Sequence, residues 1–196
     1  MGKVRTVIVA MYRTGSTNLV RGLRDILRIR HLPEPWNFDL YSESKYTDVK
    51  NVIGHGLVKT LIWQLPPGES DMIRFYSDFV KHYDNVILLG RKNRKEIAES
   101  WHKASLTGNW YWSYYLEENH SLEIDTPQHY FYCDKLEELS EKLQIPITWY
   151  EDLYSGNLDL IQKCIDQWGL KITAEQLFKY VDPKFKYRLK EPKSLL

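Results

Sequence analysis

The stretch from position 7 to position 19 reads VIVAMYRTGSTNL and decides the class of fold expected for the chain. It opens with the consecutive β-branched residues Val7, Ile8 and Val9, a pattern typical of strands buried on both faces of a parallel sheet. A short turn around Gly15 follows, and from Leu19 onward apolar residues recur at helical spacing. The stretch therefore predicts a strand, a glycine turn and a helix in direct succession.

The same order of elements recurs farther along the chain. Apolar strands are predicted near 52–58, over 86–89 and over 147–150, and helices over 71–83, 94–105 and 158–168. This alternation predicts an α/β fold with a mainly parallel central sheet flanked by helices. Because no repeat, low-complexity segment or Gly/Ser linker interrupts the chain, we expect a single domain over residues 1–196. In such sheets the turns that follow the strands share one edge, where ligands bind.

The composition excludes several classes of protein. With 43% hydrophobic and 27% charged residues in 196, the chain is neither disordered nor collagen-like. It contains no apolar run long enough for a membrane span and no signal-peptide pattern, so a cytoplasmic location is expected. Two cysteines, Cys133 and Cys164, are too few for a disulfide framework and form no metal-binding motif. We therefore expect reduced thiols and no bound metal.

The charges are segregated along the chain, although 27 Lys and Arg against 26 Asp and Glu give a net charge of +1. Residues 1–30 hold seven basic residues against one acid, whereas residues 117–152 hold ten acids against two lysines. Two further basic clusters lie at 91–95 and 184–193. If folding brings the basic clusters together they form an anion site; otherwise they are separate solvated faces.

The turn itself has the residue types of a phosphate or sulfate cradle. A strand that leads through Gly, Ser and Thr into a helix directs backbone N–H groups and the positive helix end at one point. It is not a Walker A loop, because the G-x-x-x-x-G-K-S/T spacing and its lysine are missing. The alternative is an ordinary strand-to-helix turn with a Ser or Thr cap.

The turn resembles the first signature of the sulfotransferases that use 3′-phosphoadenosine 5′-phosphosulfate (PAPS). That resemblance implies a sulfotransferase fold similar to the P-loop NTPases and a turn that holds the 5′-phosphosulfate of the donor. It also implies that Arg13 contacts the bridging or sulfuryl oxygens and takes part in catalysis. The donor-binding residues that it implies in the turn are Arg13, Thr14, Gly15, Ser16, Thr17 and Asn18.

Two later segments resemble further signatures of this family, in the family's order. Residues 86–91 (VILLGR) followed by Ala98-Glu99-Ser100 imply that Arg91 and Ser100 hold the 3′-phosphate. The nine-residue offset between Arg91 and Ser100 is similar to that of bacterial trehalose-type and some carbohydrate sulfotransferases. Residues 149–153 (WYEDL) resemble the Tyr-Glu-Asp-Leu segment whose tyrosine meets adenine, which implies that role for Tyr150. The late basic residues Lys186 and Arg188 are expected to close over the 3′-phosphate.

The general base is not where many cytosolic members of the family carry it. Their Lys-Thr-His segment is matched here by Lys59-Thr60-Leu61, which lacks the histidine. Glu34, held between two prolines, is the first candidate base, and His55 is the second. Lys59 is a candidate for contact with the bridging oxygen that leaves. The alternatives are an exposed loop glutamate, a structural histidine and a solvated lysine.

Aromatic residues at 110–115 and 129–132 suit the faces of sugars or apolar acceptors, although many of them are expected in the core. Because this region is acidic, the expected acceptor is a neutral sugar or another small alcohol. Two other functions stay open: a P-loop nucleotide kinase or other phosphotransferase, and a non-catalytic nucleotide- or glycan-binding protein. Nucleic-acid binding by the basic N-terminal helix is the least favoured alternative.

Overall fold

The computed structural model describes residues 4–37, 48–107 and 126–182. It contains a five-stranded sheet with the order β2-β3-β1-β4-β5, and every neighbouring pair is parallel. The strands are β1 (Thr6–Ala10), β2 (His31–Pro33), β3 (Leu57–Leu61), β4 (Asn85–Gly90) and β5 (Ile147–Trp149). The α/β class and the parallel sheet expected from the sequence are therefore confirmed.

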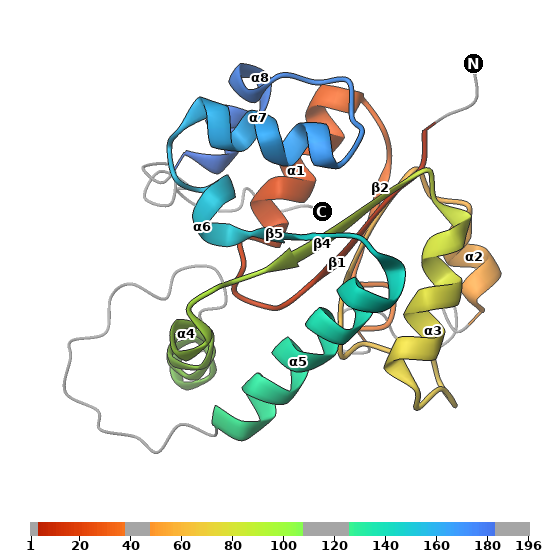
Figure 1. The fold of residues 1–196 in the computed structure, drawn as a ribbon. Helices are drawn as coiled ribbons and strands as arrows, with labels where there is room; N and C mark the ends of the chain where they lie inside the picture. Colours follow the sequence, from red (N-terminus) through yellow and green to blue (C-terminus); the bar gives the residue numbers. More distant parts are fainter. Residues whose placement is uncertain (1–3, 38–47, 108–125, 183–196) are drawn as a thin grey trace.

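Helices cover both faces of this sheet (Figure 1). The helices are α1 (Ser16–Leu27), α2 (Val49–Ile53), α3 (Met72–Phe79), the 3₁₀ helix η1 (Val80–His82), α4 (Arg94–Thr107), α5 (Thr126–Leu143), α6 (Tyr150–Leu153), α7 (Leu158–Gln167) and α8 (Ala174–Val181). Helices α1, α7 and α8 lie on one face, and α2, α3 and α5 lie on the other (Figure 1). Helix α4 packs on α5 beyond the carboxyl end of β4.

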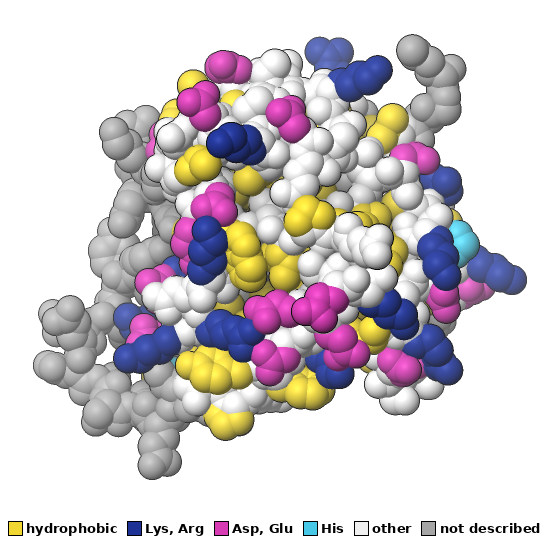
Figure 2. Space-filling model, in the orientation of Figure 1, with side chains coloured by type: hydrophobic (Ala, Val, Ile, Leu, Met, Phe, Trp, Pro, Cys, Tyr) yellow, Lys and Arg dark blue, Asp and Glu magenta, His cyan; other side chains and the backbone are white. Residues whose placement is uncertain are grey.

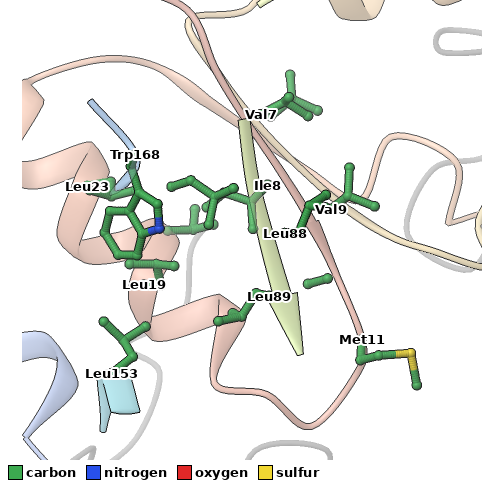
Figure 3. Close-up of a cluster of buried hydrophobic side chains, with 14 of the residues drawn as sticks. Val7, Ile8, Val9, Met11, Leu19, Leu23, Leu88, Leu89, Leu153 and Trp168 are labelled. Atoms are coloured by element: carbon green, nitrogen blue, oxygen red, sulfur yellow. The ribbon is translucent and has the colours of Figure 1, made fainter. Parts of the chain in front are cut away.

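The central strand is buried on both faces, as its run of apolar residues predicts. All five residues of β1 have no exposed surface. Ile8 lies on the side of Leu19 and Trp168, whereas Val7 and Val9 lie on the opposite side of the strand (Figure 3). Helix α1 presents a single apolar stripe to the sheet, so the position of its first turn is set by packing.

One predicted strand is wrong in position. The expected strand near 52–58 is replaced by the short helix α2 followed by β3, which starts at Leu57. The side chain of Asp48 caps α2 by accepting a hydrogen bond from the Lys50 amide at 2.8 Å, which stabilises helical geometry over the next residues. The strand therefore begins only after the segment Gly54–Gly56. The sequence-based interpretation also missed β2, α5 and α8.

In the described parts of the chain, no helix combines the length and apolar character that crossing a bilayer requires. Cys133 and Cys164 are both free and buried. Burial raises the pKa of each thiol to about 11, which keeps them protonated and unreactive at neutral pH.

Candidate functional site

The candidate site lies along the carboxyl edge of the sheet, where the segments that follow the parallel strands meet. The Arg13 turn (residues 11–16) follows β1, Glu34 follows β2, Arg91 follows β4 and Tyr150 follows β5. Because all strands are parallel, these segments leave the sheet at the same edge. The fold thus places residues from four separate parts of the chain along one edge of the sheet.

The Arg13 turn is held by its own hydrogen bonds. The Thr14 hydroxyl donates to the Met11 carbonyl at 2.6 Å, and Gly15 stands at the N-cap of α1 with φ of +72°. Thr14 and Ser16 are buried, whereas Thr17 is exposed. No side chain caps the helix start. The side chain of Thr14 therefore shapes the turn from inside, and an anion at the turn would meet the backbone amides of the first helical turn.

Tyr154, a residue that the sequence-based interpretation missed, packs directly against this turn. Its hydroxyl donates to the Gly15 carbonyl at 2.6 Å. A Cβ atom added at Gly15 would lie 2.6 Å from the Tyr154 ring, closer than real contacts allow. Glycine is required here both for its left-handed backbone and for the space taken by Tyr154. The tyrosine directly follows the Trp149–Leu153 segment, but nothing local to it signals the contact.

The first and second sequence signatures meet through their charged residues. The Arg13 Nε atom donates to the Ser100 Oγ atom at 2.7 Å, across 87 positions of the sequence. The Arg91 Nη1 atom donates to the Arg13 carbonyl at 3.4 Å. The structure therefore brings together Arg13, Arg91 and Ser100, three of the residues that the resemblance assigns to the donor.

The third signature packs under Arg91. The Arg91 guanidinium lies over the Tyr150 ring at 4.6 Å, and the rings of Tyr150 and Tyr154 stack at 4.7 Å between centroids. A continuous column thus joins Arg91, through the two tyrosines, to the carbonyl of Gly15. Tyr150 is only 8% exposed. Its position supports Arg91, and little of its ring surface is accessible for an adenine.

Two carboxylates accompany Arg91. Its Nη2 atom forms an ion pair with Glu96 on α4, and its Nε atom lies 3.9 Å from Glu151 on α6. Glu151 also accepts hydrogen bonds from the backbone amides of Lys92 at 3.0 Å and Asn93 at 3.2 Å. These hydrogen bonds join the segment after β5 to the segment after β4, the two segments that contain Tyr150 and Arg91.

Glu34 and Lys59, two of the candidate catalytic residues, form an ion pair with each other. Lys59 is 4% exposed. The second oxygen of Glu34 accepts hydrogen bonds from Asn37 at 2.8 Å and Gln64 at 3.0 Å. Glu34 has a φ of +46°, unusual for a residue other than glycine. The exposed-loop and solvated-lysine alternatives are therefore wrong for this pair.

Burial opposes ionisation of Glu34 and by itself would raise its pKa. The charge and hydrogen bond of Lys59, together with the hydrogen bonds from Asn37 and Gln64, outweigh burial and hold the Glu34 pKa below its usual value. Burial lowers the pKa of Lys59, and the Glu34 carboxylate opposes this effect. Glu34 is thus an ionised acceptor at neutral pH. Because three donors already contact its oxygens, it is a weaker base than a free carboxylate.

His55, the other candidate base, lies elsewhere. It precedes β3 and lines a surface hollow of about 590 Å³ at the amino edge of the sheet, opposite the Arg13 turn. The lining residues of this hollow are Arg24, Asp25, Arg28, Ile29, Arg30, His31 and His55. The prediction that His55 reaches the site depended on the misplaced strand, and the structure does not bring it to the other candidates.

A second residue pair that the sequence-based interpretation missed supports the turn from the side of α5. The Tyr12 hydroxyl forms a hydrogen bond with the Nδ1 atom of His129, and the Tyr12 ring packs against Trp101 at 4.4 Å. Both Tyr12 and His129 are 6% exposed. Burial lowers the pKa of His129, which favours the neutral imidazole. The aromatic run at 129–132 suits contact with an acceptor, whereas the structure buries His129 against Tyr12.

Lys186, Arg188 and the aromatic residues at 110–115 lie outside the described residues. Within the described ranges, no group of three or more His, Cys, Asp or Glu side chains is arranged to hold a metal ion.

Comparison of the sequence with protein-family models and with curated proteins finds no match.

Proposed function

We propose that the chain is a PAPS-dependent sulfotransferase that transfers the sulfuryl group to a hydroxyl of a small or carbohydrate acceptor. The contact between Arg13 Nε and Ser100 Oγ is the observation that carries the proposal. It joins a glycine turn at a helix N-terminus to a second cationic segment that contains Arg91. A donor with a 5′-phosphosulfate and a separate 3′-phosphate needs two such anion grips, whereas a nucleoside triphosphate needs one.

The chemistry of the residues suits the two anionic ends of the donor. The amides at the start of α1 and the Arg13 guanidinium supply hydrogen-bond donors for the 5′-phosphosulfate. Arg91, fixed over Tyr150, supplies a planar fork of donors for a phosphate. The segment that follows β5 completes the proposed site by positioning Arg91. We assign Tyr150 a positioning role rather than contact with adenine.

The acceptor side of the proposed site is the Glu34–Lys59 pair. Glu34 directly follows β2, and Lys59 is the middle residue of β3, the strand that pairs with β1. In the transfer step the acceptor oxygen bonds to sulfur while the bridging S–O bond breaks, in line with the attack. Glu34 accepts the hydroxyl proton, and the products are a sulfate ester and 3′,5′-ADP. Such a transfer depends mainly on positioning and charge stabilisation, so a modest base suffices.

Calorimetric titration with 3′,5′-ADP, 5′-AMP and ATP plus Mg²⁺ tests the proposal. We expect 3′,5′-ADP to bind more tightly than 5′-AMP and than ATP plus Mg²⁺. Arg91→Ala should lower the affinity for 3′,5′-ADP at least tenfold more than the affinity for 5′-AMP. Lys95→Ala is the matched control, since its exposed side chain lies on α4, the helix that follows Arg91, and pairs with Glu99. Tighter binding of ATP plus Mg²⁺ would favour the kinase alternative.

Turnover separates an enzyme from a binding protein. PAPS is supplied with a panel of sugars and small alcohols, and formation of 3′,5′-ADP is followed. Binding of 3′,5′-ADP without turnover of any acceptor would favour the non-catalytic alternative.

A further inference from the structure

The ion pair between Arg91 and Glu96 involves the very group that the proposed function assigns to the 3′-phosphate. Arg91 Nη1 donates to the Arg13 carbonyl, Nε faces Glu151, and Nη2 donates to Glu96. The Arg91 side chain is 15% exposed. An anion that approaches Arg91 Nη2 therefore has to compete with the carboxylate of Glu96 on α4.

The two carboxylates next to Arg91 differ in how firmly they are held. Glu151 is fixed by the amides of Lys92 and Asn93, and its side chain is 34% exposed. Glu96 is 47% exposed, and its other oxygen accepts a single side-chain hydrogen bond, from Asn93 Nδ2 at 2.8 Å. Glu96 can therefore rotate toward solvent at a smaller cost than Glu151.

We propose, resting on the function proposed above, that Glu96 occupies the position at Arg91 Nη2 that an oxygen of the 3′-phosphate takes in the complex. Glu96 is then a built-in competitor for that phosphate. It lowers the affinity for every nucleotide that carries a 3′-phosphate and leaves nucleotides without one unaffected. Because 3′,5′-ADP keeps its 3′-phosphate after transfer, the competition also speeds release of this product.

The competing explanation is a purely structural Glu96 that holds Arg91 in place and supports Asn93, the residue before α4. Asn93 Oδ1 accepts a hydrogen bond from the Glu96 amide at 3.2 Å, and Asn93 Nδ2 donates to the Glu96 carboxylate at 2.8 Å. The two explanations predict opposite changes in the affinity for 3′,5′-ADP when Glu96 is replaced. Removal of a structural partner weakens binding at Arg91, whereas removal of a competitor strengthens it.

The variant Glu96→Gln removes the charge and keeps the size and an oxygen that accepts from Asn93. Glu99→Gln is the matched control, because it removes one charge from the same helix at a residue that pairs with Lys95 at 3.7 Å. Affinities of the full chain for 3′,5′-ADP and 5′-AMP are measured by calorimetry. We expect Glu96→Gln to bind 3′,5′-ADP about fivefold tighter, as for loss of a partly exposed ion pair. Its 5′-AMP affinity, and both affinities of Glu99→Gln, should stay within about twofold.

Glu96→Ala, which also removes the contact with Asn93, should show the same tightening if competition is the cause. Unchanged or weaker 3′,5′-ADP binding by both Glu96 variants, with normal binding by the unmodified protein, overturns the inference and leaves the proposed function standing. Absence of 3′,5′-ADP binding in the unmodified protein and both variants overturns the two together.

Discussion

The Nε atom of Arg13 lies 2.7 Å from the Oγ atom of Ser100. The first residue belongs to the turn after β1 and the second to α4, so the hydrogen bond ties the glycine turn to the helix that follows Arg91. It also orients a guanidinium that would otherwise sample several rotamers. Arg13 is thereby preorganised for an anion at the start of α1.

Ser100→Ala should weaken binding of 3′,5′-ADP about fivefold, because one net hydrogen bond to a charged group is lost and Arg13 is less well oriented. Ser105→Ala is the matched control on the same helix. Ser105 is exposed, and its hydroxyl donates to the Trp101 carbonyl at 3.1 Å. Equal affinities of both variants and the unmodified protein would show that Ser100 does not position Arg13.

Gly15→Ala should destabilise the fold and abolish anion binding at the turn. The left-handed backbone costs an alanine about 1–2 kcal/mol, and overlap with Tyr154 costs about 1–3 kcal/mol more. Gly68→Ala isolates the first effect, since Gly68 has a φ of +83° and no atom within 4 Å of an added Cβ. Urea unfolding of the two variants measures the difference, and equal losses would argue against the Tyr154 contact.

The Glu34–Lys59 pair can be tested for separate structural and catalytic roles. Glu34→Gln alone leaves a buried lysine without its partner and should lower the free energy of unfolding by about 3–5 kcal/mol. The double variant Glu34→Gln with Lys59→Met removes both charges and should recover most of that stability.

Turnover should fall at least tenfold in the double variant, while binding of 3′,5′-ADP persists. Activity is measured as 3′,5′-ADP formation at a temperature where the variant is folded. Full turnover by the double variant would exclude Glu34 as the base and leave the pair with a structural role.

His129 should make the stability of the protein depend on pH. Burial lowers its folded-state pKa below the unfolded value of about 6.5, so the unfolded chain binds the proton more readily. Stability is therefore complete above about pH 6.5, falls as the pH drops through that value, and levels off below the folded pKa. His31 is shifted in the same direction by burial and by Arg24 and Arg21.

Urea unfolding at pH 7.5 and pH 5.5 measures this loss. In His129→Gln the difference between the two pH values should be smaller than in the unmodified protein, with the contribution of His31 still present. The same difference in both proteins would contradict the assignment to His129.

Much of the fold follows from local patterns in the sequence. Parallel strands covered on both faces are continuous apolar runs, which is why β1 and β4 were found close to their observed limits. A helix with one apolar stripe is likewise predicted from the helical spacing of its apolar residues. The predicted position of β3 was wrong, because the Asp48 cap starts a helix whose residues extend into the first part of the expected strand.

The sequence alone determines the glycine turn, the helix that directly follows it, and the two arginines with the motifs around them. Each of these features depends on residue types at short spacing. The partners are decided by tertiary structure. Strand order β2-β3-β1-β4-β5 brings Arg13 to Ser100, Lys59 to Glu34 and Tyr12 to His129. These pairs are separated by 87, 25 and 117 positions, and no local pattern encodes them. Such contacts form only when packing of the helices on a common sheet sets the distances between segments that are remote in the chain.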